Sequence, residues 1–93
     1  MSKYQIIATK EFERSIVEIE NAGETVIIKK RESYFYPQLS ENPYLPKHVK
    51  KLKNWVPISW RLRIGNWRFI FQVNESSKEI FMMAASQRKD VYR

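Results

Sequence analysis

The stretch WRLRIGNWRFIFQ, residues 60–72, decides the fold that we expect for this chain. Large apolar side chains alternate with polar ones on both sides of Gly65-Asn66, a dipeptide typical of two-residue hairpin turns. The pattern therefore predicts two antiparallel strands, over residues 58–64 and 67–73, joined by that turn.

The two-residue turn also fixes the register, because side chains alternate between the two faces of a sheet. One face then carries large apolar side chains, and burial of each would contribute about 1.5–3 kcal/mol to stability. These are Trp60, Leu62, Ile64, Trp67, Phe69 and Phe71. The other face carries Arg61, Arg63, Arg68, Ile70 and Gln72.

In this register Arg63 lies directly opposite Arg68. Like charges in a cross-strand pair are destabilising, by an amount comparable to the roughly 0.2–1 kcal/mol of a favourable pair. Two explanations need no function: a solvated face that tolerates the repulsion, or a nearby carboxylate that neutralises it. The second is weakened by the few acids in this half of the chain. Arginine presents a planar fork of donors to phosphate oxygens, so the pattern favours a phosphate-binding face.

The net charge of +7 over 93 residues is unevenly distributed. Residues 44–93 contain eleven Lys and Arg but three Asp and Glu, whereas residues 1–43 are nearly neutral. This asymmetry favours a polyanionic partner, namely nucleic acid, an anionic membrane or an acidic protein, over simple solubility. The sequence has no cysteine, no recognisable signal peptide and no apolar run long enough for a bilayer. We therefore expect a cytoplasmic protein without a membrane partner.

The length predicts a single domain over residues 1–93. Periodicity predicts a strand over residues 3–8, helices over 10–21 and 24–36, and a last strand over 79–85. Pro37 should end or kink the second helix near Tyr36, and a lysine-rich loop should follow. The fold class is α+β: an N-terminal strand, a two-helix hairpin and a three-stranded antiparallel meander, with the helices packed on one face.

Other residues are candidates for contact with nucleic acid. The loop lysines could bind phosphates, although a solvated loop is equally compatible with them. They are Lys47, Lys50, Lys51 and Lys53. His48 could transfer protons, but a lone histidine in a polar loop is more often incidental. Residues 44–93 lack clustered carboxylates, so a nuclease here would have to work without a metal, and we expect no cofactor.

Three segments carry a resemblance to a known family. WRLRIGNWRFIFQVN followed by QRKDVYR resembles the C-terminal half of RelE-type toxins, of the RelE/ParE superfamily of toxin–antitoxin systems. NPYLPKHVKKLK is similar to the loop before that motif. The resemblance implies a metal-independent endoribonuclease that cuts mRNA in the ribosomal A site. It also implies a cognate antitoxin that blocks the toxin in a hetero-oligomer.

The resemblance also implies the catalytic residues. The family's basic strand residues correspond to Arg61, Arg63 and Arg68, and its C-terminal pair to Arg88 and Tyr92. Many relatives have His in place of Gln87, and some have Lys in place of the first two arginines. Since arginine is a poor general base, the base is not identified. ParE-type relatives share the fold but inhibit DNA gyrase, so that alternative stays open. If the nuclease assignment is right, Arg68→Ala should lower the rate of RNA cleavage by about 10²–10³-fold, and full cleavage by this variant would contradict the assignment.

Overall fold

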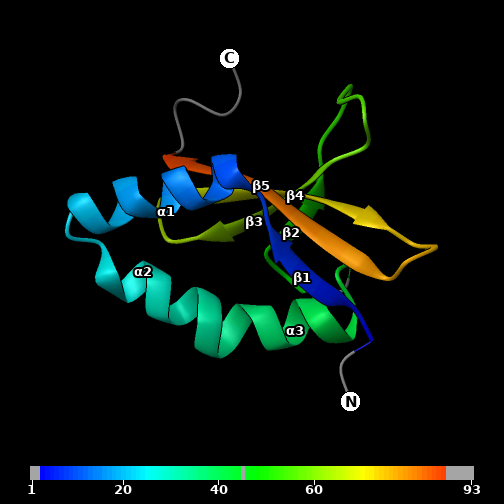
Figure 1. Ribbon diagram of the computed structural model, residues 1–93, viewed down its shortest axis with the longest axis horizontal. Helices are drawn as coiled ribbons and strands as arrows, with labels where there is room; N and C mark the ends of the chain where they lie inside the picture. The colour runs from blue at the N-terminus through cyan, green and yellow to red at the C-terminus, as the bar shows by residue number, and fades with distance from the viewer. Residues whose placement is uncertain (1–2, 45, 88–93) are drawn as a thin grey trace.

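The computed structural model describes residues 3–44 and 46–87, with only the backbone described for residues 31, 32 and 87. Figure 1 shows one sheet accompanied by α1 and by a longer helical segment. In chain order the elements are β1 (Gln5–Ala8), α1 (Lys10–Asn21), α2 (Thr25–Lys30), a π-helical turn η1 (Arg31–Phe35), α3 (Tyr36–Glu41), β2 (Val49–Lys51), β3 (Trp60–Ile64), β4 (Trp67–Asn74) and β5 (Glu79–Gln87).

The sheet has five strands in the order β1-β5-β4-β3-β2. β1 lies parallel to β5, and the other neighbours are antiparallel. The predicted α+β class and the β3-β4-β5 meander are confirmed. The hairpin register is also confirmed, with Arg63 opposite Arg68 and Ile64 opposite Trp67. Gly65 takes the positive φ of 60° that a two-residue turn of this kind favours.

The lysine-rich segment after Pro43 was expected to be a loop, but it contains the strand β2. β2 pairs with β3 at the edge of the sheet. Two of its three residues are lysines, which suit an exposed edge because they discourage pairing with another chain. Three residues are too few to show an alternating pattern, and this is why the sequence did not reveal the strand.

The first helix, α1, has the predicted bounds because its two ends are well defined. At its start, the Thr9 hydroxyl accepts a hydrogen bond from the Phe12 N–H at 3.2 Å. At its end, Gly23 has a φ of 78° and donates its N–H to the Glu20 carbonyl at 2.9 Å, while the Glu24 N–H reaches the Ile19 carbonyl at 3.1 Å. These two bonds form a Schellman motif.

The second helix extends further than predicted. Pro37 was expected to end or kink it near Tyr36, but helical structure continues through α3 to Glu41. Pro37 occupies the first turn of α3, where its missing N–H and fixed φ are tolerated. The preceding five residues are π-helical, so the proline begins a new α-helical segment instead of ending one.

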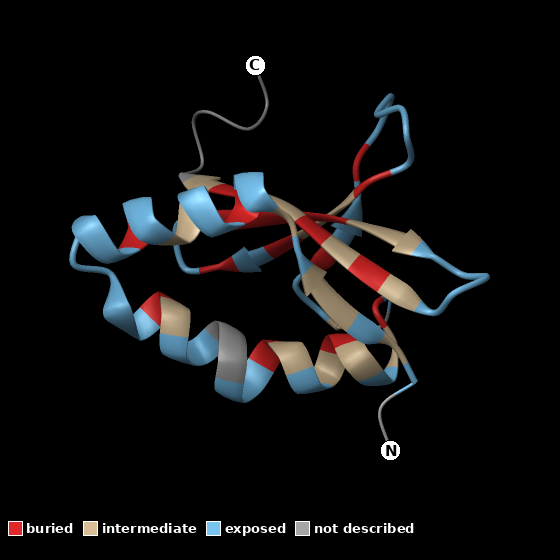
Figure 2. Cartoon of the chain, in the orientation of Figure 1, coloured by how far each residue is buried: buried red, intermediate tan, exposed pale blue. Residues whose placement is uncertain are grey.

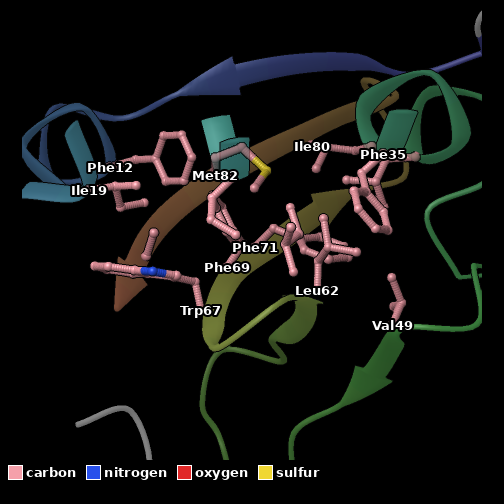
Figure 3. Packing of buried hydrophobic residues seen from close by; sticks show 14 residues of the cluster. Phe12, Ile19, Phe35, Val49, Leu62, Trp67, Phe69, Phe71, Ile80 and Met82 are labelled. Carbon is pink, nitrogen blue, oxygen red and sulfur yellow. The ribbon is translucent and has the colours of Figure 1, made fainter. Parts of the chain in front are cut away.

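The core lies between the helices and one face of the sheet. Figure 3 shows side chains from α1, η1, β2 and the meander meeting there, and Figure 2 shows the buried positions of α1, α3 and β5. Of the six apolar residues predicted for this face, five are buried: Leu62, Ile64, Trp67, Phe69 and Phe71. Trp60 is half-buried and packs against the same cluster. The core thus leaves the other face of the sheet, with its arginines, available for another role.

Candidate nucleic-acid interface

On the face of the sheet away from the core, two neighbouring cross-strand pairs each place two positively charged residues opposite one another. Lys50 of β2 lies opposite Arg61 of β3, and Arg63 of β3 lies opposite Arg68 of β4. We call these four residues the arginine face. Directly opposed residues share a face of the sheet, so all four cations lie on one side. The sequence predicted the three arginines there, and β2 adds Lys50.

The three arginines differ in their surroundings. Arg63 is exposed, whereas Arg61 is half-buried and donates from Nη1 to the His48 carbonyl at 3.2 Å. Arg68 is only 9% exposed. The solvated face considered from the sequence therefore describes Arg63 but not Arg68. Burial of a guanidinium is unfavourable unless it has partners, so the fold holds Arg68 in a defined environment.

The four candidate lysines are all exposed but do not form one group. Lys50 belongs to the arginine face. Lys51 and Lys53 line a hollow of about 470 Å³ that also includes Trp55. Lys47 lines a different hollow, with Pro37 and Glu41 beside α3, and so is separated from the others.

A hollow of about 380 Å³ adjoins Arg63 at the hairpin end of β3. Lys30 of α2 and His48 line it together with Arg63. The His48 ring packs edge-on against Phe35, with the ring centroids 5.8 Å apart. Sequence reasoning considered His48 without relying on it and overlooked Lys30, because nothing in the sequence indicates that α2 reaches the sheet here. The hollow combines two cationic side chains with an imidazole.

The described acids of the basic half lie away from the arginine face. Glu75 follows the end of β4 distant from Arg68, and Glu79 begins β5. Glu75 accepts hydrogen bonds from the hydroxyls of Tyr44 and Tyr4 and from the Lys78 ammonium. The Tyr44 hydrogen bond, followed by those from Lys78 and Tyr4, lowers the pKa of Glu75 to about 2. Desolvation and then the bond to Glu75 raise the pKa of Tyr44.

The implied C-terminal site residues, Arg88 and Tyr92, lie outside the described residues. Over residues 3–44 and 46–87 no cluster of three or more His, Cys, Asp or Glu side chains is arranged to hold a metal ion. Within the same part of the chain, no helix has the length and apolar character needed to span a membrane.

The fold is shared with chains of two solved toxin–antitoxin complexes. One is the RelBE2 complex of Mycobacterium tuberculosis, with a TM-score of 0.69, 14% identity, and coverage of 92% of this chain and 99% of that chain. The other is the archaeal RelE-RelB complex of Pyrococcus horikoshii OT3, with a TM-score of 0.68, 21% identity, and coverage of 96% and 99%. No protein-family model matches the chain, and no curated protein sequence matches it significantly. The predicted resemblance to RelE-type toxins is thus confirmed at the level of the fold.

Proposed function

We propose that this chain is the toxin of a toxin–antitoxin pair and cleaves messenger RNA in the ribosomal A site without a metal. One observation carries the proposal: two adjacent rows of like charge, Lys50 with Arg61 and Arg63 with Arg68, on the face that the core does not use. Facing cations repel each other, and a phosphate bound between them would relieve that repulsion. The shared fold with chains of two toxin–antitoxin complexes supports the same class.

In the proposed reaction the RNA 2′-hydroxyl attacks the adjacent phosphorus and the bond to the 5′-oxygen breaks. The products are a 2′,3′-cyclic phosphate and a free 5′-hydroxyl, and DNA is excluded because it lacks the nucleophile. Arg61, Arg63 and Arg68 would stabilise the charge that develops on the phosphoryl oxygens. Arg88 would stabilise the same charge or assist the leaving 5′-oxygen, and Tyr92 would orient the nucleotide or take part in proton transfer.

The general base must be another group, because arginine stays protonated. His48 lines the same hollow as Arg63, and an imidazole is well suited to proton transfer near neutral pH. This proximity supports His48 as a candidate base. Lys50, Lys51 and Lys53 would hold the flanking phosphates, with Lys47 more distant.

The proposed partner is a cognate antitoxin whose acidic or amphipathic segment covers the arginine face. Complementary charge would speed association, while apolar anchors would supply most of the affinity. An association rate unaffected by salt would count against the electrostatic part of this proposal.

The test is a ribosome-dependent cleavage assay in which cuts in translated mRNA are mapped by primer extension. Arg63→Ala is the informative variant, because Arg63 is exposed and its loss should leave the fold intact, whereas Arg68→Ala also removes a buried side chain. Arg14→Ala, an exposed arginine on α1, is the matched control. We expect Arg63→Ala to lower the cleavage rate about 10²–10³-fold, by analogy with removal of an oxyanion donor, and Arg14→Ala to change it little.

Two results would overturn the proposal. Intact mRNA together with inhibited DNA gyrase would establish the ParE-like alternative. Equal cleavage by wild type and Arg63→Ala would remove the arginine face from the mechanism.

A further inference from the structure

We infer that a hollow beside the arginine face is a binding site for one nucleobase of the RNA, and that it gives the cleavage its sequence preference. The inference rests on the proposed function and extends it from phosphate binding to base recognition. The hollow has a volume of about 350 Å³, within the range of roughly 300–1,000 Å³ typical of small-ligand pockets. The segment between β2 and β3 contributes Trp55 and Ser59, β4 contributes Ile70 and Gln72, and β5 contributes Met83, Ala84 and Ser86.

The hollow is contiguous with the arginine face. Ile70 lies directly opposite Arg61, and Ser86 lies directly opposite Arg68. Opposed residues in antiparallel strands have Cα atoms about 4.5–5.5 Å apart, so the two arginines border the hollow. A base held in it would therefore have its own sugar-phosphate at the guanidinium groups.

The floor of the hollow is apolar and is separate from the core. Ile70 is only 4% exposed, although its side chain points away from the helices, on the side of Arg61. It does not belong to the core cluster of the described residues. Trp55 and Ser59, from the segment between β2 and β3, line the same hollow as Ile70. An isolated apolar surface of this kind suits the flat face of a base, which is the chemistry that recognises unstacked RNA.

A β-bulge shapes the second wall. The register between β4 and β5 shifts between Ile70 and Phe71. Ile70 pairs with Ala84 and Phe71 pairs with Met82, which leaves Met83 as the extra residue. Bulges re-aim side chains and recur next to functional sites. Here the bulge brings the Met83 side chain to the hollow while Met82 stays in the core.

Trp55 forms the wall that can stack on a base. Its indole is 37% exposed, and it lines both this hollow and the neighbouring one that contains Lys51 and Lys53. Figure 1 shows the segment between β2 and β3 projecting from the sheet, and Figure 2 shows that its tip is exposed. An aromatic ring between a pocket and two lysines is the combination by which proteins bind single-stranded nucleic acid.

Gln72 supplies the group that can read the edge of the base. Its Nε2 donates to the Ser59 hydroxyl at 3.4 Å, and that hydroxyl donates to the Pro57 carbonyl at 3.0 Å. These bonds hold the amide at the hollow. A side-chain amide offers a donor and an acceptor side by side, which match adjacent groups on the edge of a base.

The experiment uses ribosomes programmed with mRNAs that carry each of the four bases at each A-site codon position. Trp55→Ala is compared with Val56→Ala, a control at the adjacent residue that is 95% exposed and outside the hollow. Loss of stacking should reduce kcat/KM roughly 5- to 150-fold for the preferred codons and flatten the preference at one position. Val56→Ala should retain the wild-type profile. Gln72→Glu removes the amide donor and should change which base is preferred.

An unchanged base profile in both Trp55→Ala and Gln72→Glu would overturn the inference. Absence of cleavage by the wild type would instead count against the proposed function. Binding of a base in the hollow is then tested by NMR titration with the four nucleoside 5′-monophosphates, in which the chemical shifts of the Ile70 and Met83 methyl groups are measured. Shifts that disappear in Trp55→Ala but persist in Val56→Ala support the site, and absence of shifts in the wild type overturns it.

Discussion

Phe69 and Arg68 are consecutive in the chain, and they belong to opposite faces of the same sheet. Phe69 is 0% exposed and contacts the Phe12 ring of α1, with the ring centroids 5.9 Å apart. Arg68 is also buried, yet it faces a second arginine across the strands. Burial of the phenyl ring stabilises the fold, whereas the arginine pair opposes it. The difference is consistent with the proposal that the helix-covered face serves stability and the arginine face binds a ligand.

The largest expected effect follows from removing a core side chain. Phe69→Ala should lower the free energy of unfolding by about 3–5 kcal/mol, because it deletes a fully buried ring and leaves a cavity. Urea denaturation measures this change. Phe81→Ala, at a half-buried residue on β5 outside the core cluster of the described residues, should be distinctly less destabilising. Equal losses in the two variants would mean that the helix-covered face does not dominate stability.

A charge reversal on the arginine face should instead increase the stability of the fold. Arg63→Glu converts the like-charged pair with Arg68 into an attractive pair, which should raise the free energy of unfolding by about 0.2–1 kcal/mol. The same variant should lose RNA cleavage by at least about 10²-fold, since a cation is replaced by an anion. Paired urea denaturation and cleavage assays measure the two effects.

Arg63→Gln is the matched control, because it removes the repulsion without adding an attraction. Its stability should fall between those of wild type and Arg63→Glu. If Arg63→Glu were less stable than wild type, the like-charged pair would not oppose folding, and the main argument for a ligand on this face would fail.

The hairpin was predictable because its information is local. Two strands with alternating side chains on either side of Gly65-Asn66 leave one register, and that register fixes which residues share a face. The α1 helix was predictable for the same reason, with Thr9 at its start and Gly23 at its end. The positions of the candidate site residues on β3 and β4 followed directly from these elements.

The parts that were not predicted depend on contacts between distant segments. β2 is visible only through its pairing with β3, because three residues show no period. Ile70 and Trp55 line one hollow although they are fifteen positions apart, and the Met83 bulge depends on the pairing of β4 with β5. Pro37 misled because a proline ends a helix in the interior but is accepted in a first turn. The hollow lined by Trp55 and Ile70 could therefore be found only from the tertiary structure, although Trp55 beside the lysines was a signal in the sequence.

The smallest expected effect concerns the loss of folding stability in acid, which should not arise from the arginine face. The guanidinium groups do not titrate, so acid sensitivity should arise from groups such as Glu75. Its pKa is about 2 in the folded chain, below the ordinary value of 4.5. A depressed carboxyl pKa contributes stability that is complete above the unfolded value and is lost as pH falls from 4.5 toward 2. Because the Glu75 side chain is half-exposed, solvent screening keeps this contribution small.

Glu75→Gln should therefore be less stable than wild type at pH 7 and should converge with it as the pH approaches 2. Urea midpoints measured at several pH values between 7 and 2 give this comparison, with Glu20→Gln, an exposed acid of α1, as the control. A Glu75→Gln offset that stays constant with pH would show that the hydrogen bonds from Tyr4, Tyr44 and Lys78 act through packing and not through the carboxylate charge. Cleavage by folded Glu75→Gln should match wild type, because this cluster lies at the opposite end of β4 from the arginine face.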